Sequence, residues 1–175
     1  MKELYISVDI ESSGPLVGKH SMLSLGACMV GKSTESFYIE LRPISMEAEP
    51  AAMKVSQFTL EDLSKTGIEP SLAMKSFAAW ISEVAGDSKP VFVGFNASYD
   101  WQFVNWYFLT FGHDNPFGFS ALDIKSYYMG KAGVEWTMTT SSRISPEYQP
   151  DTEQTHNALD DAIAQASIFE KLLAR

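Results

Sequence analysis

The chain has 175 residues, of which 45% are hydrophobic and 20% charged, and its formal net charge is −9. This composition is typical of a globular protein and excludes disordered and collagen-like chains. The length predicts a single domain over residues 1–175, large enough to bury a core without disulfides. The lone cysteine, Cys28, excludes an intramolecular disulfide and a cysteine-rich zinc site, and it indicates a reducing, cytoplasmic location.

Hydropathy and charge also limit the partners. No segment approaches the roughly 18 apolar residues of a membrane helix, so no membrane contact is expected. An acidic chain has little cationic surface with which to displace the counterions of nucleic acid, so its long-range attraction to a duplex is weak. A polyanionic substrate would therefore have to be held locally, by a few residues or by metal ions.

The order of the apolar segments predicts a mixed β-sheet. Three strands are expected first, over residues 4–9, 22–30 and 35–41, and their short glycine-bearing links favour an antiparallel meander. Two further strands, 91–95 and 119–122, alternate with helices in the β-α-β order of parallel strands. We therefore expect an α/β fold in which an antiparallel three-strand meander and parallel strands share one sheet flanked by helices.

Helical signals occupy the rest of the chain. Thr59 has the pattern of a helix cap, and Pro70 opens a segment of apolar residues at helical spacing. An aromatic-rich helix is expected over residues 98–110, and a last helix over residues 157–173. Residues 132–155 are rich in Ser, Thr, Pro and Gln with little periodicity, which predicts a long mobile loop.

Two carboxylates end the first predicted strand. Asp9 and Glu11 alternate with Ile10, so both acidic side chains are expected on one face of the sheet. Neighbouring carboxylates repel each other unless a cation lies between them. For this pair alone, a polar strand end that faces water is the simpler interpretation.

Acidic residues also stand at the starts of two predicted helices. Asp100 begins the aromatic helix, where a favourable interaction with the helix dipole explains it without any function. His156 precedes the last helix, and Asp160 and Asp161 lie four and five residues further on. These two side chains point to different faces, and the helix-capping role falls more easily on Asp160. A lone histidine in a loop is more often simply solvated.

Together, these clusters resemble the motifs of the DEDDh exonucleases of the RNase H-like superfamily, a group that includes proofreading exonuclease domains, oligoribonuclease and RNase T. The three motifs are Asp-x-Glu at the end of the first strand, an Asn shortly before an aromatic-Asp pair, and His-x-Ala-x-x-Asp. They are matched by Asp9 and Glu11, by Asn96, Tyr99 and Asp100, and by His156, Ala158 and Asp161. In the strand before the third motif, the resemblance implies a structural role for Asp123.

The resemblance implies an RNase H-like fold and a metal-dependent 3'-5' exonuclease. Such an enzyme would act on single-stranded or short-overhang 3' ends and release nucleoside monophosphates, with RNA somewhat preferred over DNA. Two Mg²⁺ or Mn²⁺ ions are implied, and they suit the chemistry because hard cations take carboxylate ligands and activate water at a phosphodiester. Asp9, Glu11, Asp100 and Asp161 would hold the ions, and His156 would be the general base.

Other residues are candidates for contacts with the substrate. The five assigned to this role are Ser12, Met22, Phe58, Asn96 and Trp101. Aromatic and apolar members of the set would stack on terminal bases, which needs no net positive charge, although packing in the core explains them equally well. The candidate phosphate contacts are Lys19, His20, Lys125 and Arg143.

Three alternatives to the leading interpretation remain. The enzymatic alternative is a DNA proofreading or repair 3'-5' exonuclease. A non-catalytic nucleic-acid-binding module on the same fold is disfavoured because all five motif residues are present, and a plain α/β scaffold would need five coincidental matches.

The aromatic residues crowded into residues 98–110 also indicate a homodimer, since they exceed what one core is expected to bury.

Overall fold

The computed structural model of the chain describes residues 2–112, 114–151 and 155–174. Its five-stranded sheet has the strand order β3-β2-β1-β4-β5. The strands are β1 (Glu3–Ser12), β2 (Met22–Met29), β3 (Lys32–Glu40), β4 (Lys89–Gly94) and β5 (Ala121–Asp123). β1, β2 and β3 pair antiparallel, whereas β4 pairs parallel with both β1 and β5. The expected mixed sheet with its antiparallel meander is confirmed.

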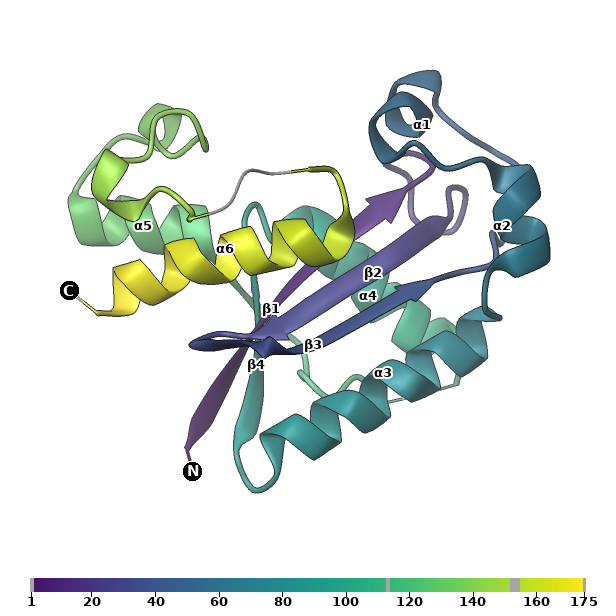
Figure 1. The fold of residues 1–175 in the computed structure, drawn as a ribbon, viewed down its shortest axis with the longest axis horizontal. Helices are drawn as coiled ribbons and strands as arrows, with labels where there is room; N and C mark the ends of the chain where they lie inside the picture. The colour runs from purple at the N-terminus through teal and green to yellow at the C-terminus, as the bar shows by residue number, and fades with distance from the viewer. Residues whose placement is uncertain (1, 113, 152–154, 175) are drawn as a thin grey trace.

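Helices cover both faces of this sheet. The α-helices are α1 (Pro50–Ser56), α2 (Leu60–Thr66), α3 (Pro70–Ala85), α4 (Ser98–Thr110), α5 (Ile124–Ala132) and α6 (Ala158–Leu173). Two short 3-10 helices, η1 (Trp136–Met138) and η2 (Pro146–Tyr148), follow α5. α6 packs on one face with α5 beside it, α3 and α4 lie against the other face, and α1 and α2 lie at the end of the sheet where β1 terminates (Figure 1). No helix in the described ranges is long and apolar enough to cross a membrane.

The helices differ in how well their sequence patterns predict them. The helix expected over residues 98–110 has these bounds, as α4, and Thr59 caps α2 by accepting a hydrogen bond from its backbone. The pattern does not predict α1 and α5. α1 buries only Ser56, and α5 buries only Ile124 and Tyr128. Because an apolar stripe is the main signal of a helix in a sequence, short and mostly exposed helices escape detection.

The segment 132–155 has more structure than the loop expected there. It contains η1 and η2, and its Ile144 and Tyr148 are buried in a cluster with Tyr128 of α5. The rings of Tyr128 and Tyr148 meet edge to face, with centroids 5.7 Å apart. Two buried anchors in an irregular backbone leave no periodicity in the sequence, so the expectation of a structureless segment is wrong in its described part. Residues 152–154 lie outside the described residues.

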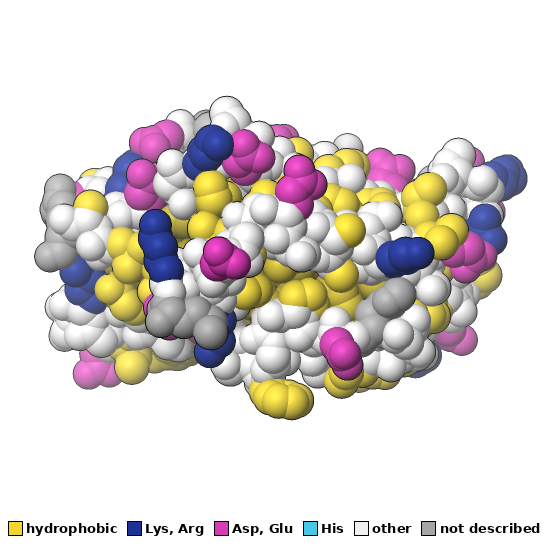
Figure 2. Space-filling view, turned by 90° about the horizontal axis from the view of Figure 1, so that it is seen from below, with side chains coloured by type: hydrophobic (Ala, Val, Ile, Leu, Met, Phe, Trp, Pro, Cys, Tyr) yellow, Lys and Arg dark blue, Asp and Glu magenta, His cyan; other side chains and the backbone are white. Residues whose placement is uncertain are grey.

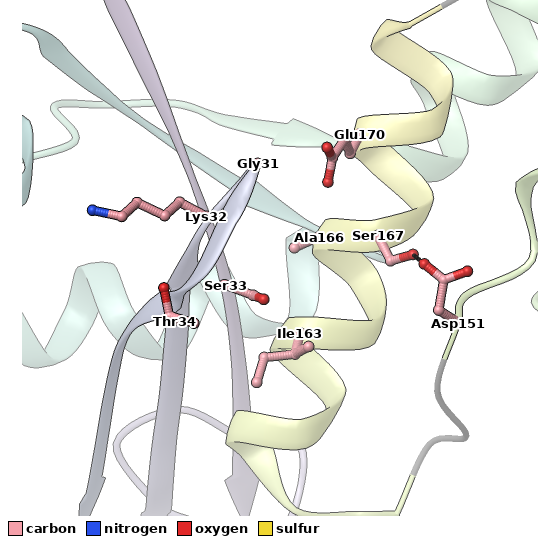
Figure 3. Close-up of a pocket in the computed structure, with 9 residues that line it drawn as sticks. All are labelled: Gly31, Lys32, Ser33, Thr34, Asp151, Ile163, Ala166, Ser167 and Glu170. Carbon is pink, nitrogen blue, oxygen red and sulfur yellow. Dashed lines mark hydrogen bonds between the residues drawn. The ribbon is translucent and has the colours of Figure 1, made fainter.

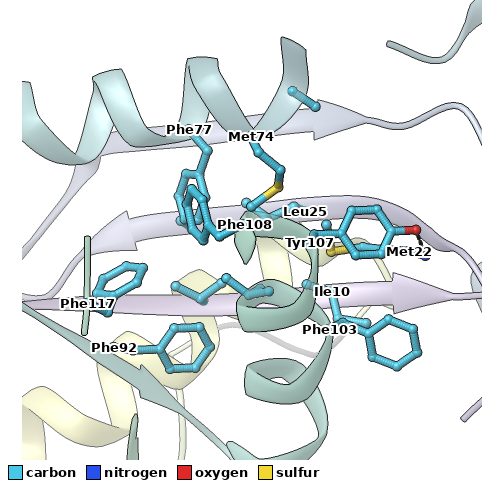
Figure 4. Close-up of a cluster of buried hydrophobic side chains, with 14 of the residues drawn as sticks. Ile10, Met22, Leu25, Met74, Phe77, Phe92, Phe103, Tyr107, Phe108 and Phe117 are labelled. Atoms are coloured by element: carbon cyan, nitrogen blue, oxygen red, sulfur yellow. Dashed lines mark hydrogen bonds between the residues drawn. The ribbon is translucent and has the colours of Figure 1, made fainter. Parts of the chain in front are cut away.

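β1 presents two different faces. Its even-numbered residues are buried among side chains of α3 and α4: Ile6, Val8 and Ile10. Figure 4 shows Ile10 in one cluster with Phe103 and Tyr107 of α4. Since side chains alternate along a strand, Asp9 and Glu11 point to the opposite face, where α6 lies. The predicted placement of both carboxylates on one face is confirmed.

The aromatic residues of α4 are covered by the chain itself. Phe103, Tyr107 and Phe108 are fully buried, and Trp101 and Trp106 are partly buried against the same core. The aromatic content of α4 therefore gives no reason to expect a homodimer.

Candidate active site

α6 approaches the sheet closely over Gly26. Gly26 of β2 pairs with Asp9 of β1, and a Cβ added at Gly26 would lie 2.2 Å from backbone atoms of Ala158 and Leu159. A glycine in a strand often marks such a close approach of another backbone segment. The first turn of α6, which carries Asp161, can therefore lie directly beside the end of β1.

Asp100 connects α4 to the end of β1. Asp100 is 4% exposed, and its Oδ1 accepts a hydrogen bond of 3.1 Å from the backbone N–H of Ile10. The β1–β4 ladder ends at Ser7, so this carboxylate pairs a backbone group that the neighbouring strand no longer reaches. A helix-dipole role alone does not account for a buried carboxylate bonded to another element. This bond brings the carboxylate of Asp100 beside Asp9 and Glu11, the residues on either side of Ile10.

Asp161 in the first turn of α6 and His156 just before this helix approach the same place. Asp161 is 6% exposed, and its Oδ1 accepts a hydrogen bond of 2.9 Å from the backbone N–H of Thr155. His156 is exposed and has a left-handed backbone with φ of 60°, which is uncommon for a residue other than glycine. Ligand atoms of Glu11, His156 and Asp161 all lie within 4.8 Å of one another. The histidine is therefore solvated, but it stands beside two of the motif carboxylates.

The capping roles fall on other side chains. Asn157 caps α6 by accepting hydrogen bonds from the backbone of Leu159 and Asp160. Asp160 is exposed and accepts a hydrogen bond from the hydroxyl of Thr155. Asp123 accepts hydrogen bonds from the backbone of Ala97 and from the first turn of α5, which is the structural role expected for it. Asp161 is thus left free of the capping function.

Burial and mutual repulsion raise the pKa values of the four motif carboxylates. Burial, reinforced by Asp161, raises the pKa of Glu11 to about 7. Burial raises the pKa of Asp100 to about 8, although the hydrogen bond from Ile10 opposes the rise. The pKa of Asp9 is raised well above its ordinary value by burial and then by Asp100, Asp161 and Glu11, and burial also raises the pKa of Asp161. A cation would favour the charged forms of all four groups.

No Lys or Arg in the described ranges forms an ion pair with these carboxylates. The ion pairs recorded there are Lys19–Glu47, Lys32–Glu35, Arg42–Glu69 and Lys171–Asp151. On the face shown in Figure 2, the Lys and Arg side chains are scattered among Asp and Glu. Carboxylate oxygens are the ligands that hard divalent cations prefer, so the unpaired cluster fits the expected Mg²⁺ or Mn²⁺ ions.

A further polar side chain, not identified from the sequence, contacts this cluster. Gln165 of α6 is 2% exposed, and its Nε2 donates a hydrogen bond of 2.5 Å to Oδ1 of Asp9. Its Oε1 accepts a hydrogen bond of 2.8 Å from the backbone N–H of Phe95. The signal in the sequence is a glutamine one helical turn after Asp161, within the buried stripe of α6. Such a position is normally apolar.

The residues assigned to substrate contacts lie in different surroundings. Ser12 is buried beside the carboxylates, Asn96 is exposed with a left-handed backbone, and Trp101 packs edge-on against the core residue Phe92. Phe58 is partly buried in a small cluster beside α2. Met22 is fully buried in the core, where its backbone N–H donates to the hydroxyl of Tyr107 (Figure 4). A base contact by the Met22 side chain is therefore contradicted, and the other four assignments remain predictions.

Among the candidate phosphate contacts, His20 is also contradicted. It is 1% exposed, and its Nδ1 accepts a hydrogen bond from the backbone N–H of Leu16. Lys19 is exposed and pairs with an acidic neighbour. Lys125 lies over the ring of Trp136 in a cation–π contact. Arg143 donates a hydrogen bond to a backbone carbonyl.

A pocket of about 340 Å³ adjoins Glu11. Its lining residues are Ile10, Glu11, Ser12, Ala51, Ala52, Val55 and Tyr99. The lining residues from α1 are apolar. Ser12 and Tyr99 add polar groups to the pocket, and their hydroxyl oxygens are hydrogen-bonded to each other at 2.7 Å. A second pocket, of about 400 Å³, lies between the β2–β3 turn and the later turns of α6, and no motif residue lines it (Figure 3).

Comparison with known proteins agrees with this arrangement. The RNase T model, described as an exonuclease family, matches residues 6–169. The 3'-5' DNA exonuclease Cap18 of Escherichia coli is 48% identical over 169 residues, which cover 96% of this chain and 90% of the relative.

Two solved structures, each 15% identical to this chain, share its fold. The nuclease domain of 3'hExo, a DEDDh family member, bound to rAMP has a TM-score of 0.78 and covers 98% of this chain and 92% of its own. E. coli exonuclease I in complex with a dT13 oligonucleotide has a TM-score of 0.70, and the match covers 99% of this chain and 42% of that one. The expected RNase H-like fold is confirmed. The chain belongs to the DEDDh family of 3'-5' exonucleases, enzymes that hydrolyse nucleic acid.

Proposed function

We propose that this chain is a metal-dependent exonuclease that removes nucleoside monophosphates from single-stranded 3' ends. The observation that carries the proposal is the cluster of four carboxylates without a Lys or Arg partner among the described residues, next to an exposed histidine. The cluster can be neutralised by the divalent cations that this family generally uses. Neutralisation also explains how a chain of net charge −9 holds a polyanion.

The motif residues divide into ligands and a base. Asp9, Glu11, Asp100 and Asp161 would hold two Mg²⁺ or Mn²⁺ ions. Such ions, when bound, supply positive charge at the scissile phosphate and activate water. His156 would accept the proton of the attacking water, because an imidazole suits proton transfer near neutral pH and this one is accessible from solvent. As the water oxygen bonds to phosphorus, the bond from phosphorus to the 3' oxygen of the preceding nucleotide breaks.

The pocket beside Glu11 would hold the terminal nucleotide. The small apolar side chains of Ala51, Ala52 and Val55 form a surface suited to a base or a sugar face. The hydroxyls of Ser12 and Tyr99 would form hydrogen bonds with the same nucleotide. Asn96, Phe58 and Trp101 remain candidates for contacts further along the strand.

We favour DNA as the substrate. The relative at 48% identity is named a DNA exonuclease, whereas the solved structures at 15% identity carry no weight on the choice of sugar. This choice follows the DNA-directed alternative rather than the modest preference for RNA expected from the sequence. We also propose that residues 1–175 form a single domain and that the protein acts in the cytoplasm.

The test uses matched fluorescent DNA and RNA oligomers of one sequence. We expect faster shortening of DNA in Mg²⁺ or Mn²⁺, complete loss of activity in EDTA, and release of mononucleotides. A 3'-terminal phosphate should block degradation, whereas a 5' block should not. Undiminished degradation in excess chelator would contradict the metal requirement, and equal digestion of both blocked strands would contradict the polarity.

A further inference from the structure

Gln165 is a buried glutamine whose amide links a motif carboxylate to the backbone of another segment. At 2% exposure both ends of its amide are paired, the donor with Asp9 and the acceptor with the backbone of Phe95. The orientation of the amide follows from its partners, because a backbone N–H can only donate and an ionised carboxylate can only accept. Gln165 also follows Asp161 by one helical turn, so both side chains lie on the face of α6 that meets the sheet.

The contact with Asp9 suits a carboxylate that must also face cations. The neighbours of Asp9 in the cluster are Glu11, Asp100 and Asp161, which repel its charge and do not donate to it when ionised. In the described part of the chain, Gln165 is the side chain recorded as donating to Asp9. Because its amide is neutral, it fixes one oxygen of Asp9 without introducing a cation that would compete with a metal ion. A Lys or Arg in its place would neutralise the cluster directly.

The contact with Phe95 ties this carboxylate to the other motifs. Phe95 follows the last residue of β4, and α4 with Asp100 begins three residues later. Gln165 therefore joins β1 and α6, which carry three of the motif carboxylates, to the connection that leads into α4 with Asp100. Partners of this kind orient metal ligands, and their loss typically lowers metal affinity or activity roughly 10- to 100-fold.

We propose that Gln165 is a positioning residue of the exonuclease site, whose amide sets the rotation of the Asp9 carboxylate relative to Asp100 and Asp161. The inference rests on the proposed metal-dependent function. It assigns to Gln165 no contact with substrate. Its role is to hold Asp9 ready for a divalent cation.

The test compares Q165M with Q149M. Methionine has nearly the length of glutamine but neither donates nor accepts these hydrogen bonds. Gln149 is a matched control because its amide also makes two hydrogen bonds within the protein, donating to the backbone carbonyls of Ser141 and Ile144, away from the motif carboxylates. Mn²⁺ affinity is measured by calorimetric titration without substrate, at a temperature where both variants are folded. Melting temperatures in EDTA and the kcat and KM for a DNA oligomer complete the comparison.

We expect Q165M to bind Mn²⁺ roughly 10- to 100-fold more weakly than wild type and to lower kcat with little change in KM. Q149M should lower the melting temperature and leave Mn²⁺ affinity unchanged. Wild-type Mn²⁺ affinity in folded Q165M would overturn the proposal and leave Gln165 a structural tie. Failure of the wild-type protein itself to bind Mn²⁺ would instead contradict the proposed function.

If Q165M does not fold, Q165A provides the same test. Its side chain neither donates to Asp9 nor accepts from Phe95, and it adds no charge to the cluster. Weaker Mn²⁺ binding than wild type supports the positioning role. Affinity equal to that of wild type in folded Q165A overturns it.

Discussion

The carboxylate of Asp100 accepts a hydrogen bond from the backbone N–H of Ile10, the residue that separates Asp9 from Glu11. Through this bond, the side chain that would help to bind metal also fastens α4 to the end of β1. The two roles can be separated, because an amide oxygen accepts a hydrogen bond as a carboxylate does but carries no charge.

For Asp100, we therefore expect Asn and Ala to act differently. D100N should keep the bond to Ile10 and have a melting temperature in EDTA at least as high as that of wild type, yet lose most Mn²⁺ affinity and turnover. D100A should lose turnover as well and be less stable than D100N by about 1–3 kcal/mol, because the N–H of Ile10 is left without a partner. Urea denaturation in EDTA and Mn²⁺ titration measure the two effects. Equal stability of the two variants would contradict the structural half of this prediction.

Variants of His156 and Asp161 should likewise distinguish the general base from a metal ligand. H156A should leave Mn²⁺ affinity nearly intact and lower the single-turnover rate by roughly 10²–10⁴, the usual contribution of a positioned general base. D161N should weaken Mn²⁺ binding as well as turnover, because a neutral amide is a poorer ligand for a hard cation. An H156A enzyme within a few-fold of the wild-type rate would reduce His156 to a solvated loop residue.

Gly26 should tolerate no side chain. In G26A the added Cβ would meet the backbone of Ala158 and Leu159 at 2.2 Å, and a backbone segment cannot turn away as a side chain can. We expect α6 to shift, at a cost of about 1–3 kcal/mol, and turnover to fall because Asp161 moves with the helix. G130A is the control, since nothing lies within 4 Å of its Cβ on α5 and alanine favours a helix. Equal unfolding curves for G26A and wild type would argue against the close approach.

The metal-free protein should lose stability as the pH rises. Burial raises the pKa of Glu11 from 4.5 to about 7 and that of Asp100 from 3.8 to about 8. Between about pH 4 and pH 8, the folded state then binds more protons than the unfolded state, and stability falls with increasing pH over this range. The contribution is fully present below the unfolded pKa values and is lost as pH passes the folded ones.

This trend can be assigned to the two residues with E11Q/D100N, whose amides do not ionise. Melting temperatures in EDTA should fall less steeply with pH for the double variant than for wild type, and saturating Mn²⁺ should restore the wild-type protein at high pH. Parallel curves for the two proteins would show that other groups govern the pH dependence.

Local patterns were sufficient to predict the parts of the site that depend on local geometry. Strand alternation placed Asp9 and Glu11 on one face, and spacing along α6 separated Asp161 from Asp160. These relations follow from the period of a strand or helix, which a sequence displays directly. The bounds of α4 were also predicted, but from its aromatic run and from Gly112 just beyond its end rather than from a periodic apolar stripe.

Contacts between distant segments could not be predicted in this way. Ile10 and Asp100 are separated by 90 positions, and Asp9 and Gln165 by 156. Met22 and His20 also carry no local sign of their burial, because both residue types occur in cores and at binding surfaces. Only the packing of α4 and of the segment before β2 decides their surroundings.

The two faces of β1 have a consequence for how mutations in this strand are expected to be tolerated. At Ile6, Val8 and Ile10, a substitution acts through the amount of folded protein, whereas at Asp9 and Glu11 it acts through the activity of each folded molecule. A scan that records abundance and nuclease activity separately should therefore show the two losses alternating with a period of two residues. Insertion of one residue would exchange the faces, sending carboxylates into the core and an apolar side chain to the catalytic surface, and should abolish both at once.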